Sequence, residues 1–180
     1  WHDWFPSVWL DEHQKGDTGP RMFTMPATDP INPNVDPLIY RLNSIYGQSQ
    51  AAAMEAKGMT GIIYNATYTN YWEGALAWAG WWHNQVGLLT EAASVRIATP
   101  TMQQMADPNH PPAPEAGGRG GRGGFGGDRG PNAILPPPRD IASRTEYPRP
   151  WLGGRWTLKD IVDYEMTATM ALLRTTSNRR

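Results

Sequence analysis

The sequence predicts a protein of the α/β class. Three short apolar segments have the character of β-strands, at residues 4–10, 61–65 and 84–90, and two longer segments carry apolar residues at helical spacing. Strands and helices therefore interleave along the chain, which is typical of an α/β domain. At 180 residues the chain is long enough for one domain with a sizeable core.

Composition narrows the classes of function. Hydrophobic residues make up 39% and charged residues 18% of the chain, which indicates a globular but loop-rich protein. The formal net charge is −1, so composition predicts neither nucleic acid nor a membrane surface as a partner. The chain has no cysteine, which excludes disulfides and thiolate zinc sites and leaves histidine and carboxylate side chains as metal ligands.

Two of the three predicted strands end on ionisable residues. The first, WFPSVWL, is followed by Asp11, Glu12 and His13 and then by a Lys-Gly turn. Such a histidine is either a metal ligand at a strand end or part of a polar surface loop. The third, NQVGLLT, ends at Glu91. Because sites in open α/β sheets gather at the carboxyl ends of strands, we expect His13 and Glu91 to approach one another in a shared cleft.

Both helices carry start signals. Asp36 can cap the first helix with Pro37 at its first position, and Lys57-Gly58 marks its end. The last helix begins after Thr157, with Asp160 three residues later. We expect the first helix to bury Leu38, Leu42, Ile45, Tyr46, Ala52 and Ala53, and the last to pack on the sheet through Leu158, Ile161, Val162, Met166, Thr169, Leu172 and Leu173.

Residues 100–150 are rich in glycine and proline and have few large apolar residues. The segment RGGRGGFGG, at 119–127, is similar to RNA-binding arginine-glycine boxes, but its two arginines in a near-neutral chain favour a flexible insertion. We expect residues 117–130 to contribute little to folding. The aromatic segment 68–82 is read as core, with an exposed carbohydrate-binding platform as the alternative.

Four runs of residues resemble the C-terminal half of a bacterial zinc carboxypeptidase of the M14 family: DEHQKG, DPINPNVDPLIYRLN, GLLTEAAS and GGRWTLKDIVDYEMTATMALL. The resemblance implies a mixed-sheet α/β/α fold that is incomplete at the N-terminus. Residues 1–99 would be the C-terminal half of the catalytic domain, 100–150 an irregular insertion, and 151–180 a helix packed on the same domain. It also implies a periplasmic or secreted protein.

The same resemblance implies roles for individual residues. His13 matches the third zinc ligand of the family, Glu91 matches its general base, and Tyr71 matches a mobile tyrosine that closes over the substrate, with Tyr68 as a weaker match. The His-x-x-Glu pair that supplies the other zinc ligands lies upstream in the family, as do the arginines that hold the substrate carboxylate. This chain, which begins at Trp1, contains neither.

The resemblance thus implies a fragment of a metallocarboxypeptidase whose parent binds zinc and a peptide substrate. We expect no turnover from the fragment alone, and we expect its partner to be the missing N-terminal half or a second copy of itself. The alternative is a non-catalytic structural or binding protein that is built on the half-fold and makes contacts through the Arg-Gly-rich loop.

Overall fold

The computed structural model describes residues 3–95, 97–110 and 133–179, and the structural statements below refer to these residues. The Arg-Gly segment 119–127 and the stretch 117–130 lie outside the described residues. The expectations for those two segments therefore stay predictions.

The main sheet has four strands in the order β1-β4-β2-β3. β1 (Val8–Lys15) and β4 (Val86–Ala93) are parallel, whereas β2 (Met22–Phe23) runs antiparallel to β4 and parallel to β3 (Ile62–Ile63). The sheet is therefore mixed, and the predicted α/β class is confirmed.

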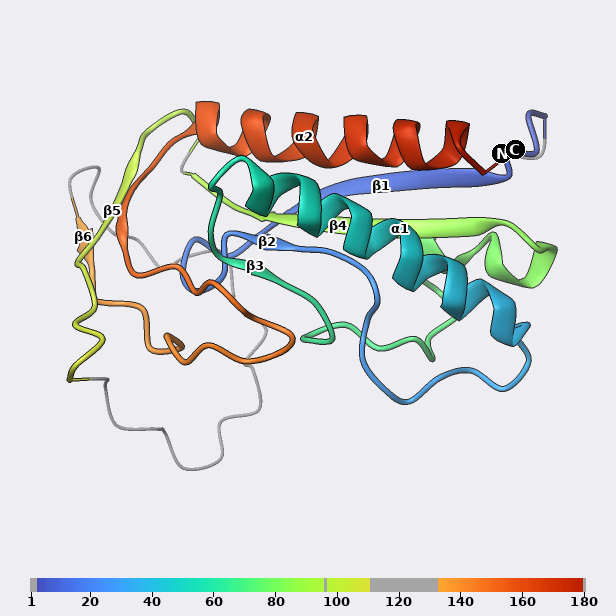
Figure 1. Ribbon diagram of the computed structural model, residues 1–180, viewed down its shortest axis with the longest axis horizontal. Helices are drawn as coiled ribbons and strands as arrows, with labels where there is room; N and C mark the ends of the chain where they lie inside the picture. Colours follow the sequence, from blue (N-terminus) through green and yellow to red (C-terminus); the bar gives the residue numbers. More distant parts are fainter. Residues whose placement is uncertain (1–2, 96, 111–132, 180) are drawn as a thin grey trace.

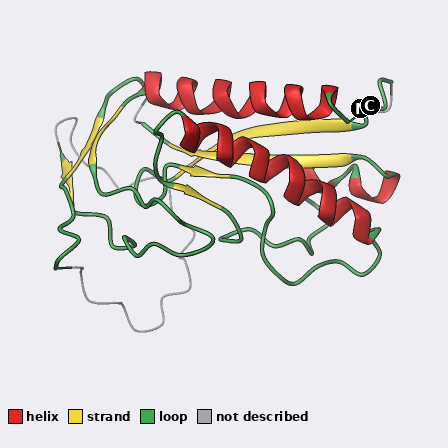
Figure 2. Ribbon diagram, viewed as in Figure 1, coloured by secondary structure: helices red, strands yellow, loops and turns green. Residues whose placement is uncertain are grey.

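Two long helices cover one face of this sheet. α1 (Pro37–Ala56) and α2 (Leu158–Ser177) lie side by side, and both contact β4 (Figures 1 and 2). The hydroxyl of Thr90 in β4 donates to Glu165 of α2 at 2.9 Å, so the even-numbered side chains of β4 point toward the helices. We call this side of the sheet the helix face.

Loops and two short 3₁₀ turns, η1 (Leu76–Trp78) and η2 (Trp81–His83), pack on the opposite side, which we call the loop face. A Cβ placed on Gly87 would lie 1.8 Å from the carbonyl oxygen of Ala77, so η1 approaches β4 at the one position that has no side chain. Trp78 and Trp81 are buried and stack with ring centroids 4.6 Å apart, which confirms the core interpretation for those two residues.

A second, smaller sheet lies at the end of the molecule where α2 begins (Figure 1). It joins β5 (Thr101–Gln103) in parallel to β6 (Ile134–Leu135) and antiparallel to β7 (Gly154–Trp156). The described part of residues 100–150 thus contributes two short strands as well as irregular chain.

The first predicted strand is wrong in its boundaries. β1 begins at Val8 and continues through Asp11, Glu12 and His13 to Lys15, so the chain does not leave the sheet at Asp11. The reason is that β1 pairs with β4 residue by residue over its whole length, so the polar part is held in the sheet by the same ladder as the apolar part. His13 consequently lies near the carboxyl end of a strand and not in a loop.

The start and end of α1 are confirmed. Asp36 accepts a hydrogen bond from the backbone N–H of Leu38 at 2.8 Å, and Gly58 follows the helix with φ of 81°. Its predicted buried face is only partly right. Tyr46 is buried and Leu42 packs half-buried against the core, but Leu38 is 61% exposed and the helix buries polar Asn43 and Gln50. The close approach of the Met25 backbone to Gly47 decides this face, since a Cβ there would lie 2.0 Å from the Met25 carbonyl oxygen.

The capping box of α2 is confirmed by hydrogen bonds in both directions between Thr157 and Asp160. Its predicted packing face is partly wrong. Ile161 and Leu172 are buried, but Leu158, Val162, Met166 and Leu173 are exposed, and Tyr164, Ala168 and Ala171 are buried instead. The two alanines let the helix approach its neighbours closely, which turns the larger predicted residues outward.

Candidate functional site

His13 and Glu91 lie side by side on the sheet. They are register partners on the adjacent parallel strands β1 and β4, near the carboxyl end of each. Residues at matched positions of neighbouring strands point to the same face, and for this pair that is the loop face. Glu91 is 7% exposed, whereas the side chain of His13 is 52% exposed. The pair therefore joins a buried carboxyl group to an accessible imidazole.

Asp11 orients the imidazole of His13. The Nε2 atom of His13 lies 2.9 Å from Oδ1 of Asp11, two residues earlier on the same face of β1. A histidine that binds a metal through one ring nitrogen commonly bonds a carboxylate through the other. The contact with Asp11 leaves Nδ1 as the nitrogen that could bind a metal.

The carboxyl group of Glu91 has a raised pKa. Burial is the largest cause, and it is opposed by a hydrogen bond with Tyr68 and by the charges of His13 and Lys15, while Asp11 adds to the rise. A carboxyl group whose pKa moves upward toward neutrality is a better general base than an ordinary glutamate. The environment of Glu91 is thus suited to proton transfer.

Tyr68, and not Tyr71, contacts this carboxyl group. The Tyr68 hydroxyl shares a hydrogen bond with Glu91, and burial, that bond and the charge of Glu91 all raise the pKa of Tyr68. Its ring centroid lies 4.9 Å from that of Phe23. Tyr71 is 51% exposed, and its backbone carbonyl accepts a hydrogen bond from the Asn32 side chain at 3.0 Å. The role expected for Tyr71 stays a prediction.

Lys15 adds a cation to the loop face. Its ammonium group donates to the carbonyl of Pro20, and burial lowers its pKa to about 7, helped by the charge of Arg21 and opposed by Glu91 and Asp17. Neither Lys15 nor Asp11 was singled out as a site residue from the sequence. The period-two alternation of a strand through His13 would have placed both on its face.

The described residues do not form a complete zinc site. A catalytic zinc needs about three protein ligands and a water, and His13 supplies one imidazole. Among the described residues, no group of three or more His, Asp or Glu side chains is placed to hold a metal ion. The donor set therefore fits one ligand position and not a whole centre.

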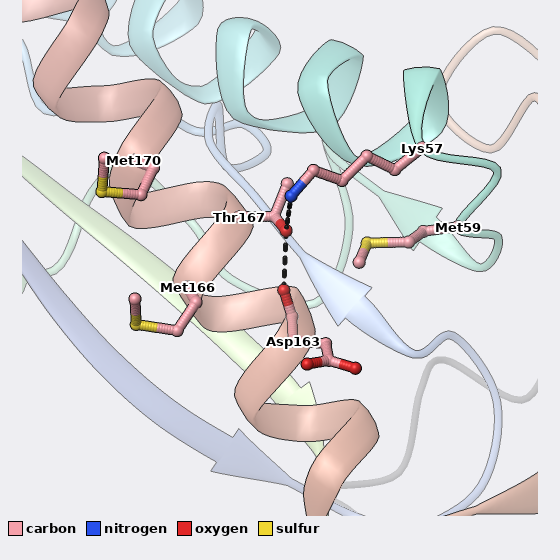
Figure 3. A pocket seen from close by; sticks show the side chains of 6 residues that line it. All are labelled: Lys57, Met59, Asp163, Met166, Thr167 and Met170. Atoms are coloured by element: carbon pink, nitrogen blue, oxygen red, sulfur yellow. Dashed lines mark hydrogen bonds between the residues drawn. The ribbon is translucent and has the colours of Figure 1, made fainter.

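A separate hollow of about 460 Å³ lies between the end of α1 and the outer side of α2 (Figure 3). Three methionines, Met59, Met166 and Met170, line it together with Lys57, whose ammonium donates to the hydroxyl of Thr167 at 2.9 Å. It belongs to the two helices and not to the loop face that carries His13.

Comparisons with protein-family models, with curated proteins and with solved structures return no significant match. Within the described ranges, neither long helix is both apolar and long enough to cross a bilayer.

Proposed function

We propose that this chain is the C-terminal part of a zinc-dependent metallocarboxypeptidase, a hydrolase that removes C-terminal residues from peptides. The observation that carries the proposal is the pairing of His13 with Glu91 at the carboxyl ends of two parallel strands. A hydrolytic zinc site requires an imidazole ligand and a nearby carboxylate base, and this pair offers one of each.

The residues of the chain have distinct parts in this proposal. Asp11 holds His13 so that Nδ1 is available to the metal. Glu91 accepts a proton from the attacking water and later delivers it to the leaving amine, while Tyr68 fixes the position of its carboxyl group. Tyr71 closes over the substrate. Zinc held by His13 and by ligands of the N-terminal half would supply the Lewis acid for this hydrolysis.

The remaining zinc ligands belong to an N-terminal half in this proposal. His13 lies on β1, the outermost strand of the main sheet, and a strand added parallel to it would end beside His13. The same half would supply the second helical layer of the α/β/α arrangement, because α1 and α2 both lie on the helix face.

Zinc titration followed by NMR of the histidine rings tests the proposal. We expect zinc to shift the His13 resonances first, and His13→Ala to remove this binding. His110→Ala is the matched control, because His110 is also exposed and also contacts an aspartate, Asp107, at 2.8 Å. Zinc binding that survives His13→Ala and is lost in His110→Ala would contradict the proposal.

A non-catalytic binding protein built on the same half-fold is the second candidate. The exposed apolar residues on the outer side of α2 favour it, since monomeric proteins rarely leave such residues in a contiguous row. Zinc separates the two candidates, because only the first requires a metal at His13.

A further inference from the structure

Within the described residues, β1 is an edge strand of the main sheet. β1 is eight residues long, pairs with β4 along one edge, and is the first strand in the order of its sheet. No described residue pairs with its other edge. A strand of this length with a free edge is a template for another strand.

A row of apolar side chains on α2 flanks that edge. We call Leu158, Val162, Met166 and Leu173 the α2 stripe; they are 42%, 51%, 56% and 56% exposed. At about 100° per residue, the four positions fall within roughly 80° of the helix circumference. The hydroxyl of Thr169, which lies in the same sector, donates to Glu12 of β1. This hydrogen bond places the sector of the α2 stripe beside β1.

We propose that the α2 stripe and the free edge of β1 join two copies of the 180-residue chain in a two-fold symmetric dimer, with β1 pairing antiparallel to β1 of the second copy. A strand edge is self-complementary in antiparallel pairing, because each strand offers alternating N–H and C=O groups. A row of purely apolar residues is likewise complementary to itself, as a two-fold contact requires. The proposal concerns the 180-residue chain by itself and does not rest on the proposed peptidase function, in which a strand of an N-terminal half would occupy the same edge of β1.

The spacing of the elements suits this dimer. α2 contacts both β4 and β1, so its axis lies over these two strands (Figure 1). Pairing the two β1 strands about 4.8 Å apart would place the two α2 axes roughly 10 Å apart, if each lies midway over its strands. Helices that pack through side chains lie about 8–10 Å apart. The α2 stripes of the two copies would therefore meet on the helix face of a continuous sheet.

The lengths of the two contact elements agree, and the α2 stripe supplies part of the area that a stable interface buries. β1 extends for about 26 Å and the α2 stripe for about 22 Å, so strand and helix contacts can form together. The exposed parts of the four stripe side chains offer on the order of 350 Å² per copy, nearly half of the about 800 Å² that each partner buries in a standard interface. The strand edge adds to this area.

Light scattering after gel filtration tests the proposal on the purified chain. We expect a mass of twice 20.0 kDa that falls toward the monomer on dilution. Replacing Val162 and Met166 together by lysine should raise the dissociation constant at least about tenfold, because two charges would face each other across the two-fold axis. Leu38→Lys is the control, because Leu38 is an equally exposed apolar residue near the start of α1.

Hydrogen exchange locates the contact. In the dimer, the amides of β1 that point to its outer edge should exchange slowly, and the double lysine variant should restore fast exchange at those amides alone. Thermal unfolding of the variants reports whether they remain folded. A monomer at all concentrations, or a dimer that the lysine pair leaves unchanged, would overturn the proposal.

Discussion

Neighbouring side chains of β1 point to opposite faces of the sheet. Asp11, His13 and Lys15 point to the loop face and make the candidate site with Glu91, whereas Glu12 points to the helix face and accepts a hydrogen bond from Thr169. A shift of one residue in the pairing of β1 with β4 would exchange these two sets. The polar cluster therefore depends on register as much as on residue type.

For the single side chains of the candidate site, we predict that Tyr68→Phe raises the pKa of Glu91 further. The Tyr68 hydroxyl bonds the carboxyl group and lowers its pKa, so removing it takes away one of the effects that oppose burial. Loss of this bond should also lower the free energy of unfolding by about 1 kcal/mol. NMR titration of the Glu91 side-chain carbon measures the pKa.

Tyr71→Phe is the matched control for that prediction, because the Tyr71 side chain is half-exposed and the hydrogen bond from Asn32 to this residue uses its backbone carbonyl. Tyr71→Phe should change neither the pKa of Glu91 nor the free energy of unfolding. Equal effects of the two substitutions would show that the contact between Tyr68 and Glu91 is not specific.

A second prediction concerns Glu165 on the helix face. Burial raises its pKa to about 7, opposed by the hydrogen bond from Thr90, while the charges of Glu12 and Glu91 raise it further. Because the folded pKa lies above the unfolded value of about 4.5, the folded state holds the proton more tightly. Stability contributed by the protonated group is therefore present below pH 4.5 and is lost as pH rises toward 7.

Glu165→Gln should remove this loss. We expect the wild-type chain to lose about 2 kcal/mol more than the variant in unfolding free energy between pH 5 and pH 8, as measured by urea denaturation. Glu73→Gln, at an exposed position, should leave the pH dependence unchanged. If wild type and Glu165→Gln have parallel pH profiles, the raised pKa of Glu165 is not the cause of the pH-dependent loss of stability.

At the scale of the elements, local signals and packing faces differ in how well the sequence predicts them. Caps are decided by a few neighbouring residues, so Asp36, Thr157 and the glycine after α1 were all identified from sequence. The buried faces depend on where each helix meets the rest of the chain. Gly47 and the alanines of α2 set those contacts, and small residues carry no hydrophobic signal in the sequence.

The capping box of α2 yields a prediction at this scale. Thr157→Ala removes the acceptor for the Asp160 N–H and the donor to its carboxylate, and should lower the free energy of unfolding by about 1 kcal/mol. Thr157→Ser keeps the hydroxyl and should retain most of the stability. Urea denaturation of both variants measures the difference, and equal losses would mean that the hydroxyl is not the cause.

For the whole molecule, the sequence predicted the α/β class and the approach of His13 to Glu91, because strand ends and polar residues are visible locally. The strand order β1-β4-β2-β3 was not predicted, since it depends on pairings between distant segments. The sequence also did not show that Tyr68, and not Tyr71, contacts Glu91. That choice depends on the path of the loop after β3, which is set by long-range contacts such as the bond from the Thr28 N–H to the Tyr68 carbonyl.

The molecule as a whole also limits what the proposed site can do. Positioning of reactants contributes several kcal/mol of barrier lowering in reactions of this class, and the described residues provide one imidazole and one carboxyl base toward it. A single imidazole holds zinc weakly, so Glu91 has no activated water to deprotonate.

We therefore predict that the purified 180-residue chain, given zinc and a panel of blocked dipeptides, releases no C-terminal residue above the uncatalysed rate. Liquid chromatography of the released amino acids is the measurement, and Glu91→Gln is the control for catalysis by this site. Zinc-dependent release that Glu91→Gln abolishes would contradict the prediction, because it would mean that further residues of this chain complete the ligand set around His13. Release that survives Glu91→Gln would instead come from a contaminant or another site.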